Sequence, residues 1–289
     1  MREANPLQNT SRTLRTLREA NPPTTNLRVR RPVPKQTLKK ITMKTLPYFA
    51  AIIMTISFTT GCCASGNFQT DEFKTKSGKT VTITAIKHAS LRIQYDGLEI
   101  QVDPVVKLEP QTNYSAFPKA DVILITHEHF DHCDTAAITA LKKSGTQIIA
   151  NPAVEKKLGN GTALKNGESL TIAKGIQIEA VPAYNTTSGH TQFHPKGRDN
   201  GYVLTIDGLR IYIAGDTEVI PEMAALKDID VAFLPCNQPY TMTPEQVAKA
   251  AKTIKPKTLF PYHYSDTPVK KVAELLKGES IDVRIRNYK

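Results

Sequence analysis

The chain has 289 residues, of which 40% are hydrophobic and 22% are charged, so it can bury a sizeable core and has the composition of a soluble globular protein. The formal net charge is +11, but residues 1–42 contain ten Lys and Arg and only two acids, which leaves 28 basic and 25 acidic residues in the rest of the chain. The rest therefore carries only +3, and without a basic patch nucleic acid is excluded as the expected partner.

The first 62 residues predict two segments outside the folded domain. Residues 1–42 repeat the sequence REANP and lack apolar periodicity, which predicts a disordered basic segment. Residues 43–62 have the layout of a secretory signal, with Met43 and Lys44 followed by an apolar stretch and a Gly-Cys pair. Because a signal should start the chain, we expect translation to begin at Met43, making 1–42 a mis-annotated start. A genuine disordered extension is the alternative.

The end of the signal predicts a lipid anchor. Its sequence TTGC resembles a bacterial lipobox, in which Cys62 becomes the lipidated first residue. We therefore expect an exported lipoprotein, held on a membrane and facing the periplasm or the cell surface. A plain cleaved signal or a retained apolar anchor are the alternatives. The polar residues 63–78 are interpreted as a tether.

Regular structure is expected from residue 79 onward. Alternating patterns predict half-buried strands, Asp-Gly pairs at 96–97 and 207–208 predict hairpin turns, and the apolar run 121–126 predicts a strand buried on both faces. Helices are expected at 134–143, with Asp134 as N-cap, at 243–254, with a capping box, and at 268–277. The predicted strands are 80–86, 91–95, 98–103, 121–126, 146–150, 169–173, 176–183, two within 201–216, 230–235, 258–264 and 281–288. Hairpins followed by strand–helix alternation indicate one α/β domain, 79–289, with two sheets covered by helices.

The stretch ITHEHFDHCD follows the buried strand and predicts a metal site. It brings His127, His129, Asp131 and His132 together at the end of a rigid element. Imidazole nitrogens and carboxylate oxygens are the ligands of zinc, iron or manganese, and no set of thiolates indicates a closed structural site. The two cysteines of the domain, Cys133 and Cys236, could pair in an exported protein or remain free thiols.

The pattern His127-x-His129-x-Asp131-His132 resembles the HxHxDH signature of the metallo-β-lactamase superfamily. Two later motifs arrive in that family's order: YIAGDT (212–217) resembles the segment of the bridging aspartate, and PYHY (261–264) the segment of the last histidine. KHASLRI (87–93) and VDP (102–104) are similar to the opening strands of the branch that contains the ascorbate-6-phosphate lactonase and the N-acyl phosphatidylethanolamine phospholipase D. The resemblance covers about residues 79–289 and implies a four-layer αββα sandwich of two mixed β-sheets.

The resemblance also implies a site and a reaction. His127 and His129 would bind one metal, Asp131, His132 and His263 the other, and Asp216 would lie between them. The expected cofactor is a pair of zinc ions, with manganese, nickel or iron as alternatives. A metal-bound hydroxide would attack an ester-type bond in a phosphodiester or a lactone, in a small-molecule or lipid-derived substrate, with Asp131, His132 and Asp216 as the catalytic residues. A true β-lactamase is not expected.

One ligand of the family pattern is missing from its usual place. Tyr184 and Asn185 follow the strand where a histidine is expected, whereas His190 and His194 lie in the next loop. We favour His194, because FHPKG has the character of a fixed turn. Without a third histidine the site would hold fewer metals, and the alternative function is a surface lipoprotein that binds metal or ligand without turnover.

Other polar residues are placed near the site with less definite roles. His88 is expected at its entrance together with Asp103, which could orient a histidine ligand; a buried core pair is the alternative. Tyr240, Tyr262 and Tyr264 could stabilise developing negative charge or simply pack at strand ends.

Overall fold

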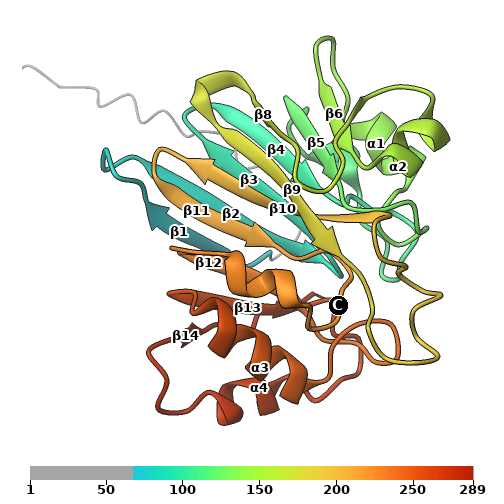
Figure 1. The fold of residues 1–289 in the computed structure, drawn as a ribbon. Helices are drawn as coiled ribbons and strands as arrows, with labels where there is room; N and C mark the ends of the chain where they lie inside the picture. The colour runs from blue at the N-terminus through green and yellow to red at the C-terminus, as the bar shows by residue number, and fades with distance from the viewer. Residues whose placement is uncertain (1–67, 289) are drawn as a thin grey trace, which may run out of the picture. The chain divides into compact units, whose positions relative to one another are not determined.

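The computed structural model describes residues 68–288, so the expected basic segment 1–42, the signal 43–62 and its Cys62 lie outside the described residues. Within this range, two mixed β-sheets of seven strands face each other (Figure 1). The first sheet has the order β1-β2-β3-β4-β5-β6-β7 and the second the order β14-β13-β12-β11-β10-β9-β8. The strands are β1 (Thr70–Lys74), β2 (Thr80–Lys87), β3 (Ser90–Tyr95), β4 (Leu98–Val102), β5 (Val122–Ile125), β6 (Gln147–Ala150), β7 (Thr162–Ala163), β8 (Ser169–Thr171), β9 (Gln177–Ala183), β10 (Asp199–Ile206), β11 (Leu209–Ile213), β12 (Val231–Pro235), β13 (Thr258–Tyr262) and β14 (Asp282–Val283).

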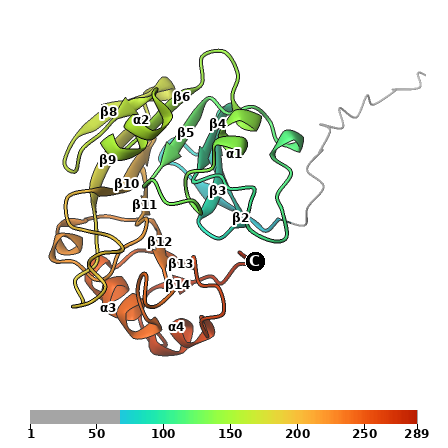
Figure 2. The same ribbon diagram turned by 90° about the vertical axis from the view of Figure 1, so that its right-hand side faces the viewer.

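Helices cover the outer faces of both sheets. Helices α1 and α2 lie beside β5 and β6, whereas α3 and α4 lie beside β12 and β13 (Figures 1 and 2). The four-layer αββα sandwich expected from the sequence is therefore confirmed. The helices are α1 (Thr135–Leu141), α2 (Pro152–Leu158), α3 (Pro244–Ile254) and α4 (Lys270–Leu275), with short 3₁₀ helices η1 (Tyr114–Ala116), η2 (Ala173–Gly175) and η3 (Pro221–Ala225). Among residues 68–288, no helix has both the length and the apolar character that crossing a membrane needs.

Strand β5 is buried on both faces, as its continuous apolar run predicts. Val122 and Leu124 belong to the core between the sheets, whereas Ile123 and Ile125 pack in the separate core beneath α1. Successive side chains of a strand point to opposite faces, so only a strand with a layer on each side can bury all four. This double burial holds the chain rigidly where β5 ends and the histidine motif begins.

The two Asp-Gly pairs form the predicted hairpins. Asp96 and Gly97 join β3 to β4, and Asp207 and Gly208 join β10 to β11, in antiparallel pairs. Both residues of each pair have positive φ, between 46° and 80°. Two-residue hairpins favour this left-handed conformation because its twist matches that of the strands, and Asp-Gly reaches it at little cost.

The structure corrects the boundaries at both ends of the domain. The expected tether, 63–78, contains strand β1, which pairs with β2, and the final strand is only Asp282–Val283 instead of 281–288. Asp71 of β1 accepts hydrogen bonds from Arg284 and Arg286, more than 210 residues away. The ion pairs of Asp71 are long-range, so the polar local sequence of β1 does not reveal them.

Further differences concern helix α2, the two-residue strand β7, which was not predicted, and the cysteines. Helix α2 was not predicted, although Asn151 caps it, Pro152 begins it and Gly159 ends it in a left-handed conformation. Its seven residues are too few for apolar periodicity to emerge. Cys133 and Cys236 are both buried and free, so the disulfide considered for them does not form.

Candidate metal centre

Polar side chains gather at one edge of the two sheets. The motif 127–132 follows β5, Asp216 follows β11, and His263 directly follows β13. His194 lies in the long loop between β9 and β10. The carboxyl ends of parallel strands share one edge of a sheet, which is why segments far apart in the chain meet here.

The backbone around this edge has unusual conformations. Gly215 has φ of +65°, and a Cβ added there would lie 2.7 Å from the carbonyl oxygen of Asn200. Only glycine fits this turn, which presents the next residue, Asp216. His88, Asp103 and His263 also have positive φ, between 41° and 54°, although they are not glycines. Such strained residues concentrate at functional sites, where the surrounding structure holds them in place.

Three histidines form the first group of potential ligands. The Nε2 of His127 lies 3.1 Å from the Nδ1 of His129. The ring of His194 lies 5.1 Å from that of His127 and 5.0 Å from that of His129, measured between centroids. The group His127, His129 and His194 places one nitrogen of each ring within 4.8 Å of the others, which is close enough to share one ion.

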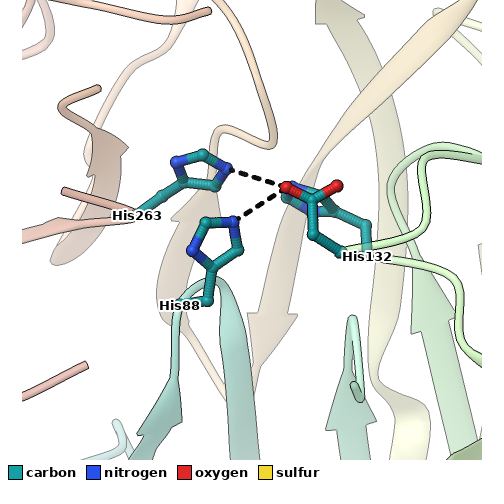
Figure 3. Close-up of side chains that lie close together, drawn as sticks. His88, His132 and His263 are labelled. Atoms are coloured by element: carbon teal, nitrogen blue, oxygen red, sulfur yellow. Dashed lines mark hydrogen bonds and ion pairs between the residues drawn. The ribbon is translucent and has the colours of Figure 1, made fainter. Parts of the chain in front are cut away.

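A second group contains His88, Asp131, His132 and His263. His88 and His263 approach from one side with ring centroids 3.7 Å apart, and His132 lies opposite them (Figure 3). The Oδ2 of Asp131 lies 3.1 Å from the Nε2 of His88 and 3.9 Å from the Nε2 of His263. This group contains every residue that the family resemblance implies for the second metal, and His88 in addition.

Asp216 lies between the two groups. Its Oδ2 is 3.9 Å from the Nε2 of His127 and 3.4 Å from the Nε2 of His194, both in the first group. The same oxygen is 3.4 Å from the Nε2 of His132 and 3.2 Å from the Nε2 of His263, both in the second group. One buried carboxylate oxygen thus faces four imidazole nitrogens, an arrangement that suits a carboxylate shared by two cations.

The residues present fit metal ions, because several of their buried donor atoms lack hydrogen-bond partners. Buried polar atoms are nearly always hydrogen-bonded. In the described residues, however, the Nε2 atoms of His132, His194 and His263 and the Oδ1 of Asp216 are buried without a hydrogen bond. The Nε2 atoms approach Oδ2 of Asp216 at 3.2 to 3.4 Å without forming such a bond. Nitrogen and carboxylate donors that converge without partners are what a zinc-type ion requires.

The opposite nitrogens of two of these rings are held by the protein. The Nδ1 of His132 lies 2.9 Å from the Oδ2 of Asp103, and the Nδ1 of His194 lies 3.1 Å from the carbonyl oxygen of Tyr240. Asp103 is itself fixed by the backbone N–H and the hydroxyl of Thr126, at 2.8 and 2.6 Å. Such partners set the tautomer and direct Nε2 toward a metal. Asp103 therefore orients His132, while His88 contacts Asp131.

Electrostatics in the cluster favour added positive charge. Burial lowers the pKa of His127 well below its ordinary value and that of His194 to about 4, so both rings are neutral at neutral pH, the state that binds metals. Burial also opposes charge on His132, but the carboxylates of Asp216 and Asp131 outweigh it and raise the pKa of His132 well above its ordinary value. The same two carboxylates would attract a divalent cation.

His190 does not join the cluster. Its Nδ1 lies 3.2 Å from the Oε1 of Glu218, and its side chain is a quarter exposed, whereas His194 is buried. The Oε2 of Glu218 also accepts hydrogen bonds from the backbone N–H groups of Thr186 and Thr187, at 2.7 and 2.6 Å. Sequence reasoning missed Glu218, which organises the loop that carries His194. His194, and not His190, thus lies with His127 and His129.

The remaining sequence expectations have mixed outcomes. Asp134 caps α1, as predicted, and accepts a hydrogen bond from Ala136. The Tyr262 hydroxyl accepts from the N–H of Gly215, and the Tyr264 hydroxyl donates to the carbonyl oxygen of Arg286, so neither faces the cluster. Tyr262 and Tyr264 therefore pack at the strand ends. Of the three tyrosines, only Tyr240 lines the cavity above the cluster.

A model of the β-lactamase superfamily domain matches residues 82–263, more than half of the chain. The match begins in β2 and ends on His263, so it contains both groups and Asp216. The chain belongs to the metallo-β-lactamase superfamily. Its relatives are named as metal-dependent hydrolases, and the protein is a metal-dependent hydrolase of this superfamily.

Three superfamily relatives support this placement. A UPF0173 metal-dependent hydrolase of Thermococcus onnurineus is 36% identical over 200 residues, which cover 65% of this chain and 86% of the relative. A structure from Parabacteroides distasonis ATCC 8503, assigned to the metal-dependent hydrolases, is 61% identical with a TM-score of 0.74 and covers 77% of this chain and 100% of that one. The metallo hydrolase Igni18 of Ignicoccus hospitalis is 25% identical with a TM-score of 0.61, covering 71% and 94%.

Proposed function

We propose that this hydrolase binds two divalent cations, both zinc, and cleaves an ester-type bond, the class that contains phosphodiesters and lactones. The observation that carries the proposal is the position of Asp216, whose Oδ2 faces nitrogens of both ligand groups at 3.2 to 3.9 Å. A single carboxylate between two sets of donors supports two cations sharing it. Histidine and aspartate without thiolates favour zinc over softer metals, and manganese, nickel or iron are alternatives that the same donors accept.

The ligands divide between two positions. His127, His129 and His194 would hold the first cation, and Asp131, His132 and His263 the second, with Asp216 shared. We assign His88 to neither set, because its Nε2 is already 3.1 Å from the carboxylate of Asp131. When bound, the cations supply Lewis acidity and lower the pKa of a coordinated water from 15.7 toward about 7.

The chain's own residues then orient the reactants. Burial opposes charge on Asp131, but His132 and the hydrogen bond from His88 hold the pKa of its carboxyl well below the ordinary range. Asp131 is therefore ionised, and it lines the cavity above the cluster. It can accept a hydrogen bond from the attacking water and fix the direction of attack, while Asp103 keeps His132 in place.

Metal analysis combined with hydrolysis assays tests this function. We expect two zinc ions per chain by inductively coupled plasma mass spectrometry and turnover of carboxylic or phosphoric ester probes. Asp216→Ala should lower the metal content and abolish turnover, because both cations lose their shared ligand. Asp282→Ala, on the exposed strand β14, is the matched control and should change neither. A folded wild-type protein that binds no metal would contradict the centre, and turnover of amides without esters would contradict the bond class.

We also propose that the protein acts as an exported lipoprotein, anchored by Cys62 on a membrane and facing the periplasm or cell surface. The support is the signal-like pattern of 43–62, which lies outside the described residues. This location would bring the site to small-molecule or lipid-derived esters in the envelope. Metabolic labelling with a palmitate analogue should mark the wild-type protein and not Cys62→Ser. A wild-type protein that is exported but unlabelled would overturn the anchor.

A further inference from the structure

A cavity of about 430 Å³ lies directly above the metal centre. Its floor is formed by residues of the cluster, including Asp131, Asp216 and His263. Its walls come from the loops that follow β5, β9, β12 and β13. This volume lies within the usual range for small-molecule pockets. The side chains of the walls that belong to neither ligand group are therefore placed to contact a substrate.

One wall is aromatic and open to solvent. Phe130 is 67% exposed and Tyr240 is 45% exposed, and these are two of the three large hydrophobic side chains that are exposed in residues 68–288. Phe193 packs edge-on against Tyr240, with ring centroids 4.9 Å apart. A group of exposed apolar side chains next to a polar rim is typical of a ligand-binding surface. The opposite wall is polar, with Asn237 and Ser265.

The cavity has no cationic wall. None of the residues that the structure describes as lining it is a lysine or an arginine. The guanidinium of Arg198, whose Nη2 lies 3.4 Å from the Nε2 of His129, is paired with the carboxylates of Asp199 and Glu128. Lys87, in the adjoining cavity, donates to two backbone carbonyl oxygens. Apart from the two cations proposed on its floor, the cavity therefore offers no free arginine or lysine from the described residues to the negative charge of a phosphodiester.

We propose that the substrate is an uncharged carboxylic ester or lactone whose apolar group, aromatic or alkyl, packs against Phe130, Phe193 and Tyr240. This inference rests on the ester hydrolysis proposed above. The oxygen of water bonds to the acyl carbon, the acyl C–O bond breaks, and the alkoxide takes up a proton, giving a carboxylic acid and an alcohol. Asn237 and Ser265, whose Nδ2 and Oγ are 3.4 Å apart, face the polar end of such a substrate.

Three matched substrates test the proposal with the zinc-loaded protein. Ethyl phenylacetate and ethyl acetate differ only by the ring, and ethyl phenyl phosphate is the charged diester; products are measured by chromatography. We expect kcat/KM for ethyl phenylacetate to exceed that for ethyl acetate about tenfold, the effect of burying one ring, and to exceed that for the phosphodiester. Phe130→Ala and Phe193→Ala should each reduce the ratio of the two carboxylic esters. Leu275→Ala, an exposed apolar side chain elsewhere, should leave it unchanged.

A binding measurement separates the pocket from the reaction. Calorimetric titration should show that phenylacetamide, an uncharged probe with the same ring, binds more tightly than diphenyl phosphate, and that Phe130→Ala weakens its binding. This result without turnover of any ester would overturn the proposed function and still support the aromatic pocket. A higher kcat/KM for the phosphodiester would overturn the pocket proposal. So would aromatic variants that leave both the ester selectivity and the binding of phenylacetamide unchanged. Neither result would contradict the proposed hydrolysis of ester-type bonds.

Discussion

Asp103→Asn should weaken zinc binding although Asp103 would touch no metal. The side chain is fully buried, and its carboxylate receives three hydrogen bonds, at 2.6, 2.8 and 2.9 Å, from Thr126 and His132. Asparagine is nearly the same size and tolerates the positive φ of this position, so the backbone should persist. Its amide, however, has a single oxygen, so its nitrogen must face either the Nδ1–H of His132 or the backbone N–H of Thr126. In either orientation two donors oppose each other, and His132 loses the negatively charged partner that orients it.

The size of the effect follows from these contacts. Removing a partner that orients a ligand histidine typically lowers metal affinity about 10- to 100-fold. The variant also loses up to two of the three buried hydrogen bonds, at about 1–3 kcal/mol each, so the free energy of unfolding should fall by about 2–6 kcal/mol. Loss of the fold must therefore be measured separately from loss of affinity.

Competition with a chromophoric zinc chelator gives the affinity, and urea unfolding gives the stability. Asp134→Asn is the matched control, because Asp134 is equally buried but accepts hydrogen bonds from the backbone of Ala136 and Val106 instead of a histidine. Asparagine is also a good N-cap but can accept from only one of these two N–H groups, so this variant should keep its zinc affinity and lose about 1–3 kcal/mol of stability. A folded Asp103→Asn protein with wild-type zinc affinity would refute the argument that Asp103 orients a metal ligand.

Three further perturbations probe the same centre. His194→Ala should reduce bound zinc from about two ions to about one by mass spectrometry, whereas His190→Ala should not; the reverse result would exchange their roles. Gly215→Ala places a Cβ 2.7 Å from the carbonyl oxygen of Asn200 at φ +65°, and should lower the free energy of unfolding in urea by about 2–4 kcal/mol; an unchanged midpoint would contradict this. Chelator treatment should lower the Tm by about 16–32 °C in differential scanning fluorimetry, because zinc at a thousand times its Kd contributes about 4 kcal/mol at each of the two sites; an unchanged Tm would mean that the centre does not stabilise the fold.

Local sequence determined the central part of the fold. The run Val122–Ile125 predicted a strand buried on both faces, and the two Asp-Gly pairs predicted hairpins, because these signals depend on neighbouring residues alone. The capping box of α3 was visible for the same reason, and Thr243 and Gln246 form it as expected. Strand β1 was missed because its polar sequence has no apolar alternation. It becomes a strand only through its pairing with β2 and its contacts with the C-terminal arginines.

At the site, the sequence by itself determined the chemistry of the donors. The close spacing of His127, His129, Asp131 and His132 after a rigid strand left little freedom for where these side chains could lie. Spacing cannot decide between His190 and His194, because a long loop can present either. The tertiary structure decides this through Glu218 and the carbonyl oxygen of Tyr240, which hold the two rings in different places.

The wall that faces the substrate was also decided only by tertiary structure. Phe130, Phe193 and Tyr240 lie in three separate loops, and each alone reads as an isolated apolar residue. They form one surface because the ends of β5, β9 and β12 meet at the same edge of the sandwich. Donor types are a property of local sequence, whereas the shape and charge of a pocket arise from segments that only folding brings together.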